Sequence, residues 1–401
     1  MKGRVLPYLS GRFFDGISSG LFIMALPWLM LKEPNMGTFV ALTALACTLT
    51  SFVLTPFLAT CIDRLSRKFV LIMVQCLQVL TALIVLFLFA FDLVSVWWLA
   101  LSQVVFWVSS NVAWTANNAF TQENFDKHEY AKISGYQEII LQSTNLGAGA
   151  LGIVLLEVWG MFEFALFAAG ASTLSALSYI VTPYRRKLVV SKVKTPYLEQ
   201  LKESKQTFAR YPYFFAFILI SCLSYPVLTY LGRLIPILFS EWNVEGKWVA
   251  LFNMSFGLGS LFSGFIFAAV LAKYSHQSVM KVGITVIAIM LFSMGLVVEP
   301  VMIVGMQFIL GIFNALNRIS RTNWMHHVIP IDIRGRIDGG LAMFATSVQS
   351  LSYVGIAFMT HYNLIEFGFM AIACVVGMGA IGMYFLDKTL RNKEGLIPVS
   401  E

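Results

Sequence analysis

Long apolar stretches alternate with short polar linkers along nearly the whole chain. Each stretch holds about 20 residues or more with few or no charges, and an α-helix of that length spans the hydrocarbon core of a bilayer. The pattern therefore predicts twelve membrane-spanning helices. Their approximate ranges are 8–31, 37–59, 69–91, 94–119, 131–156, 161–182, 212–238, 248–272, 279–298, 301–324, 334–360 and 365–386.

Features of the first half of the chain return roughly 200 residues later. Leu26-Pro27, near the end of the first apolar stretch, has a counterpart in Ile235-Pro236. The stretch that begins at Tyr130-Ala131-Lys132-Ile133-Ser134-Gly135 has one in Arg334-Gly335-Arg336-Ile337-Asp338-Gly339. A spacing this long is no solenoid period. Two copies of a six-helix unit are typical of membrane transporters.

The longest polar stretch separates the two copies and sets the expected domain organisation. It follows the sixth apolar stretch and fits a cytoplasmic tether that lets the halves rock. We expect an N-terminal half over 1–182, a linker over 183–211, a C-terminal half over 212–386 and a tail over 387–401.

Composition and charge agree with an all-α membrane protein. The chain is 58% hydrophobic and 12% charged, with a net charge of +7, whereas soluble domains carry about 25% charged residues. Of its 28 Lys and Arg residues, Lys32 and Lys247 fall outside, Arg12 and Arg233 fall within spans, and the others fall on one side. By the positive-inside rule that side is cytoplasmic, and so are both termini. The net charge is thus no sign of nucleic-acid binding.

Signatures of enzymes, metal sites and cofactors are missing from the sequence. There is no phosphate-binding Gly-x-x-x-x-Gly-Lys-Ser/Thr loop, no Gly-x-Ser-x-Gly elbow and no His-Glu-x-x-His pair. The five cysteines are scattered without metal-ligand spacing. The first apolar stretch is too long for a cleavable signal peptide. We therefore expect no enzyme, no cofactor and no metal, and transport driven by an ion gradient or running downhill.

A charged motif follows the second apolar stretch. Asp63, Arg64, Arg67 and Lys68 lie within one short turn. An acid beside clustered cations can join helix ends in one conformation and release them in another. The motif predicts a conformational latch, with an ordinary basic inner loop as the alternative.

These residues resemble the loop motif of the major facilitator superfamily, Asp-Arg-x-Gly-Arg-Arg/Lys after a glycine. Thr60, Cys61 and Ser66 stand where that motif has small or glycine residues. Within the superfamily, the chain is similar to the branch of the enterobactin exporter and the macrolide efflux pumps. Besides Asp63 to Lys68, the stretches that carry this likeness are Lys132 to Gln137 and Ile329-Pro330 through Gly339.

The resemblance implies that helices 1, 4, 7 and 10 line a central cavity. Charged residues inside membrane spans are costly and mark transport pathways, and polar residues gather in these four stretches. The candidate cavity residues are Asp15, Ser110, Trp114, Asn117, Arg233, Asn314, Arg318 and Arg321. In the repeat, Ser110, Trp114 and Asn117 correspond to Asn314, Arg318 and Arg321.

Two kinds of chemistry follow from these candidates. Arg318 and Arg321 suit an anionic, carboxylate-bearing substrate, because a guanidinium binds a carboxylate through two parallel hydrogen bonds. The alternative is that these two side chains reach the inner lipid headgroups. Asp15 is the first candidate to carry a proton, with a structural Arg12–Asp15 pair as the alternative. Glu138 is the second, with a role at a helix N-terminus as the alternative.

Together these features predict a monomeric transporter in the inner membrane of a bacterium that works by alternating access. The resemblance implies proton-coupled export of a siderophore or a similar anionic metabolite. Efflux of drugs or macrolides, import of an iron-loaded siderophore and a non-transporting receptor or assembly factor are the alternatives.

Overall fold

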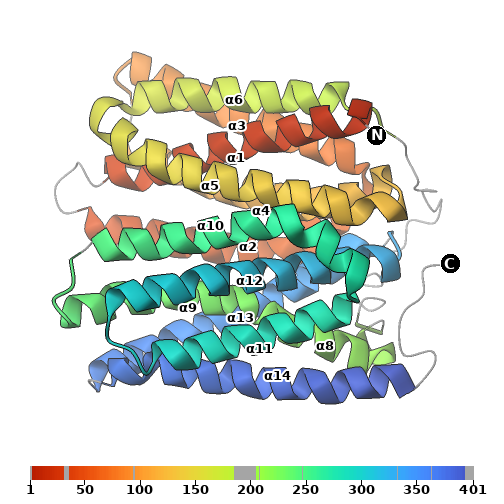
Figure 1. The fold of residues 1–401 in the computed structure, drawn as a ribbon. Helices are drawn as coiled ribbons and strands as arrows, with labels where there is room; N and C mark the ends of the chain where they lie inside the picture. The colour runs from red at the N-terminus through yellow and green to blue at the C-terminus, as the bar shows by residue number, and fades with distance from the viewer. Residues whose placement is uncertain are drawn as a thin grey trace. The chain divides into compact units, whose positions relative to one another are not determined.

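The computed structural model describes residues 2–30, 36–93, 95–184, 205–206, 208–245, 247–331, 333–362 and 364–392. The predicted linker 183–211 therefore lies largely outside the described residues. The described part is built of α-helices with two short 3-10 turns (Figure 1). The long helices are α1 (Lys2–Met30), α2 (Gly37–Arg64), α3 (Arg67–Ala90), α4 (Val96–Asn124), α5 (Tyr130–Val158), α6 (Met161–Val181), α8 (Pro212–Cys222), α9 (Ser224–Glu241), α10 (Lys247–Lys273), α11 (His276–Met294), α12 (Pro300–Val328), α13 (Arg334–His361) and α14 (Gly368–Asn392).

Every predicted span corresponds to a helix or a helix pair. Eleven segments of the described residues are long and apolar enough to cross a membrane, and α5 covers the remaining predicted span. The predicted span 212–238 differs in detail, because α8 ends at Cys222 and α9 begins at Ser224. Pro226 explains this break, since proline has no N–H for the carbonyl four residues earlier and its ring crowds that carbonyl. At the other end of the chain, α14 runs past the predicted boundary at 386.

Two compact units make up the structure. Unit 1 comprises Met1–Asp126, Ile140–Lys194 and Ile331–Gly339, and unit 2 comprises Lys127–Ile139, Thr195–Pro330 and Gly340–Glu401. The first turns of α5 thus belong to unit 2, and the first turns of α13 belong to unit 1. Each unit therefore contains one short segment from the other half of the sequence.

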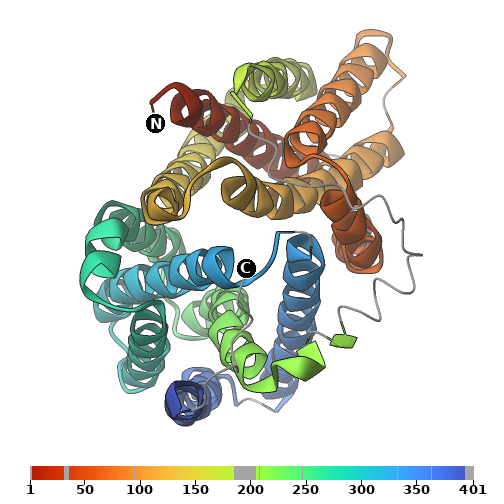
Figure 2. The same cartoon turned by 90° about the vertical axis from the view of Figure 1, so that its right-hand side faces the viewer.

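The same helix pairs pack in both units. In unit 1, α6 packs on α1 and α3, and α4 packs on α2 and α3. In unit 2, α14 packs on α8 and α11, and α12 packs on α10 and α11. Figure 2 shows the helices close to end-on, with each unit a bundle. The two halves of the sequence repeat therefore pack their equivalent helices in the same pairs.

Helix starts and outward faces follow from local chemistry. Ser66 accepts a hydrogen bond from the N–H of Phe69 at the start of α3, and Ser275 does the same for Ser278 at the start of α11, as N-cap serines do. Pro212 and Pro300 occupy first helical positions, where a missing N–H costs nothing. Many large apolar side chains are exposed on the helices, as a lipid-facing surface requires.

Candidate functional site

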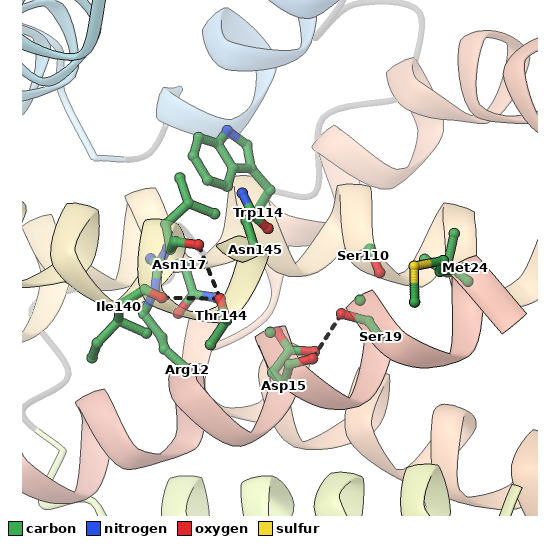
Figure 3. A pocket seen from close by; sticks show the side chains of 14 residues that line it. Arg12, Asp15, Ser19, Met24, Ser110, Trp114, Asn117, Ile140, Thr144 and Asn145 are labelled. Atoms are coloured by element: carbon green, nitrogen blue, oxygen red, sulfur yellow. Dashed lines mark hydrogen bonds between the residues drawn. The ribbon is translucent and has the colours of Figure 1, made fainter. Parts of the chain in front are cut away.

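One cavity of about 330 Å³ opens within unit 1. It is lined by residues from α1, α4 and the part of α5 that belongs to this unit (Figure 3). Small-molecule sites fall at about 300–1,000 Å³ and combine apolar walls with a few polar groups. Four sequence candidates share this cavity: Asp15, Ser110, Trp114 and Asn117.

Arg12 and Asp15 carry the charge of the cavity. They lie three residues apart on one face of α1, and their exposed fractions are only 9% and 8%. Nη1 of Arg12 and Oδ1 of Asp15 have no hydrogen-bond partner among the described residues, and no ion pair joins the two side chains there. The structural pair considered as an alternative for Asp15 is thus not formed in this structure.

The cavity lining from α4 and α5 includes an aromatic ring and side-chain amides. The guanidinium carbon of Arg12 lies 5.9 Å from the ring centre of Trp114 on α4, a cation–π distance. Asn117 is buried, and its Oδ1 has no hydrogen-bond partner in the described part of the chain. Thr144 and Asn145 of α5 complete this polar lining. Sequence reasoning missed these two residues because nothing in the sequence singles out one face of α5.

α1 and α5 are in close contact beside the cavity. A Cβ on Gly16 would lie 2.6 Å from Oγ1 of Thr144, and one on Gly20 would lie 3.0 Å from Cβ of Ala148. A larger residue at either glycine would push the two helices apart. Small residues let membrane helices approach this closely.

The candidates of the tenth predicted span lie on α12 and bind protein groups in unit 2. Nη2 of Arg318 donates to Oε1 of Glu138 at 2.6 Å. Nη1 of Arg321 donates to the backbone oxygen of Ser221 at 2.7 Å, and Nδ2 of Asn314 donates to that of Ser224 at 2.7 Å. Arg321 and Asn314 thereby satisfy carbonyls at the break between α8 and α9. Substrate binding by Arg318 and Arg321 stays a prediction.

Arg233 lies apart from these groups within unit 2. Its guanidinium carbon is 5.7 Å from the ring centre of Tyr353 on α13. Its role in the cavity also stays a prediction.

The charged motif after α2 joins the start of α13 within unit 1. Asp63 accepts hydrogen bonds from the N–H groups of Gly335 at 2.7 Å and Arg336 at 3.0 Å. Nε of Arg336 and Nη2 of Arg67 also approach its carboxylate, at 3.3 and 3.4 Å. A carboxylate at a helix N-terminus satisfies free N–H groups and opposes the helix dipole. Arg336 belongs to the motif at the start of α13, but its contact with Asp63 could not be predicted from the sequence.

The remaining basic residues of the motif have different surroundings. Arg67 is fully buried and donates to the backbone oxygen of Ile331 at 2.7 Å. Nζ of Lys68 donates to the backbone oxygens of Ile180 and Thr182 at the end of α6. Arg64 is exposed. The motif therefore ties together the ends of α2, α6 and α13 through hydrogen bonds that would have to break if these ends separated.

The sequence model of the Major Facilitator Superfamily matches residues 8–353, and the chain belongs to this superfamily. A search of curated protein sequences finds no match.

Solved structures of the same fold cover nearly the whole chain. A bacterial homologue of the iron transporter ferroportin in an outward-facing state has a TM-score of 0.77 at 14% identity, covering 96% of this chain and 99% of that one. The transporter FucP in an outward conformation has a TM-score of 0.75 at 12% identity, covering 95% and 98%. The proton:xylose symporter XylE bound to 6-bromo-6-deoxy-D-glucose has a TM-score of 0.72 at 11% identity, covering 96% and 95%.

Proposed function

We propose that this transporter exports a siderophore or a similar metabolite with an anionic group across the bacterial inner membrane, in exchange for protons. It works by alternating access as a monomer, with both termini in the cytoplasm. The observation that carries the proposal is the cavity in unit 1, where Arg12 and Asp15 each keep a buried charged atom without a partner.

Arg12 supplies the anion-binding group. A buried charged nitrogen without a hydrogen-bond partner is costly, and a carboxylate-bearing substrate would provide the partner that Nη1 of Arg12 lacks among the described residues. The indole of Trp114 adds an apolar surface for the rest of the molecule. Arg318 and Arg321 remain proposed substrate contacts only for a conformation in which Glu138 and Ser221 have released them.

Asp15 supplies the proton-carrying group in this proposal. Its carboxyl group lines the same cavity one helical turn from Arg12. Substrate and proton would therefore act on neighbouring groups of one helix, which is what exchange of one for the other requires. Glu138 is paired with Arg318, and we rank it second.

Asp63 and its partners supply the two-state element. The hydrogen bonds from Gly335 and Arg336 hold the end of α2 against the start of α13. In the proposed cycle these bonds form in one state and break in the other.

Ligand-induced thermal stabilisation of the detergent-solubilised protein tests this function. The panel holds carboxylate siderophores, catecholate siderophores and cationic drugs, each siderophore with and without iron. A ligand at a hundredfold excess over its Kd adds about 2.7 kcal/mol of stability. We expect iron-free anionic ligands to stabilise the wild type and a control at the exposed Arg210, Arg210→Gln, but not Arg12→Gln. Equal stabilisation of Arg12→Gln would contradict the proposed site.

A multidrug pump is the second candidate, because Asp15 and Trp114 also suit a cationic amphiphile. Stabilisation by cationic drugs that disappears in Asp15→Asn would put this candidate first. Stabilisation by iron-loaded siderophores alone would indicate import instead of export.

A further inference from the structure

Two fully buried glutamines face Asp15 from outside the cavity lining. Gln75 and Gln78 lie three residues apart on α3, and both side chains are 0% exposed. Their amides are close enough to interact with the Asp15 carboxyl group. Neither residue lines the cavity. Asp15 thus lies between the cavity and a pair of buried amides.

The hydrogen-bonding capacity of this cluster is largely unused. Oδ1 of Asp15, both amide atoms of Gln75 and Nε2 of Gln78 have no hydrogen-bond partner among the described residues. Oε1 of Gln78 accepts a bond from Ser172 at 3.4 Å, and the Ser172 and Ser18 hydroxyls are 2.8 Å apart. Buried polar groups are nearly always paired, so several open ones at one place need an explanation.

The second copy of the repeat shows that the fold does not need these amides. Ser66 and Ser275 cap equivalent helices. Counted from these caps, Gln75 and Gln78 correspond to Ile284 and Ile287, and both isoleucines are also 0% exposed. Counted from Pro27 and Pro236, Asp15 corresponds to Ser224. The amides occur in the copy that has the acid, and apolar side chains fill the same places in the copy that lacks it.

We propose that Gln75 and Gln78 are positioning residues that partner Asp15 in both of its protonation states. An amide has N–H donors for a carboxylate and an oxygen acceptor for a protonated carboxyl group. Reorienting the amides therefore lets Asp15 take up and release a proton without leaving its buried position. This inference rests on the proposed proton coupling through Asp15 and adds the residues that make it workable.

Asp15 also has charged, titratable and uncharged polar neighbours. Arg12 on α1 and Tyr179 on α6 are the titratable groups that act on it. Arg12 has donors only and keeps its charge. The cavity residues of α4 and α5, such as Asn117 and Thr144, are uncharged.

Infrared difference spectroscopy of the purified full-length protein, titrated with pH and without ligand, tests the inference. Acidification of the wild type should produce a carboxyl C=O stretching band that is missing in Asp15→Asn. In the Gln75→Ile/Gln78→Ile variant we expect this band at higher frequency, because the carboxyl group has lost its hydrogen bonds. The titration midpoint should rise by about one pH unit, a tenfold change in proton affinity, because hydrogen bonds to the charged form are the stronger ones.

Two controls separate positioning from folding. Gln103→Ile removes another buried amide of unit 1 outside the cavity lining and should leave band and midpoint unchanged. Gln75→Asn/Gln78→Asn keeps the amides and should restore part of the shift. Circular dichroism and size-exclusion chromatography confirm that each variant is folded.

The possible results bear differently on the two proposals. An unchanged band and midpoint in Gln75→Ile/Gln78→Ile would overturn the role of the glutamines and leave proton binding by Asp15 intact. Absence of an Asp15 band in the wild type at every pH would overturn both. A band that responds to sodium ions at constant pH would replace the proton by sodium at this site.

Discussion

The two copies of the repeat place an arginine near the same helix from different positions and use it differently. In unit 1, Arg12 of α1 lines the cavity with an unpartnered Nη1. Its counterpart in unit 2 is Ser221, and the arginine there, Arg321, comes from α12 and binds the Ser221 carbonyl. One guanidinium keeps a nitrogen without a partner among the described residues at the cavity, and the other is hydrogen-bonded by the protein. The comparison shows that two copies of a repeat can keep the same helix packing while placing their arginines in different surroundings.

A second pair of equivalent places shows the same division. At the junction of α2 with α13, Asp63 holds the helix start through hydrogen bonds and charge. At the junction of α10 with α5, Gly135 and Gly264 bring the helices together, and a Cβ on Gly135 would lie 2.7 Å from the Gly264 oxygen. One junction is polar, and the other depends on close packing of small residues.

The largest effect is expected at the polar junction. Asp63→Ala removes the partner of the buried Arg67 and of two helix N–H groups, and breaking a buried pair costs about 3–5 kcal/mol. We expect a large fall in the apparent melting temperature and in transport, measured by a thermal shift assay and by uptake into vesicles. Asp92→Asn, at an exposed position after α3, is the control and should change neither.

The brace between α12 and the broken helix should show the next largest effect. Arg321→Leu removes the charged donor of the Ser221 carbonyl and leaves it with neutral donors such as Asn317. Hydrogen bonds to charged groups contribute about 1.5–3 kcal/mol. The matched change in unit 1, Arg12→Leu, removes a charge with an unpartnered nitrogen and should leave stability unchanged or higher. Equal destabilisation of the two variants in denaturant unfolding would remove the distinction between the copies.

Close packing at the second junction predicts a smaller effect. In Gly264→Ala the new Cβ would lie 2.8 Å from Cγ1 of Ile139 and 2.9 Å from the Gly135 oxygen, and such overpacking costs about 1–3 kcal/mol. In Gly339→Ala the nearest atoms to the new Cβ would be Cβ of Ala59 at 3.0 Å and Cγ2 of Thr55 at 3.5 Å. The melting temperature should fall further for Gly264→Ala, and the reverse order would contradict the packing argument.

The fold could be predicted from the sequence because membrane spans are long, apolar and repeated. The cavity residues of α1 and α4 could also be found, since polar side chains such as Asp15 and Asn117 stand out in an apolar helix. The partners of Arg318 and Arg321 could not, because Glu138 and Ser221 are far from them in the sequence. Asn314 and Arg321 have the residue types of a binding site and here satisfy backbone groups of a broken helix. Composition alone cannot separate these two roles.

The most direct test of the account measures the protons displaced when a ligand binds. The ligand is the panel member that stabilises the wild type, added to purified protein in weakly buffered solution. We expect the wild type to release protons on binding and Asp15→Asn to release none, while the Glu138→Gln variant behaves as the wild type. Proton release that is unchanged in Asp15→Asn would contradict the claim that the cavity of unit 1 couples substrate to protons.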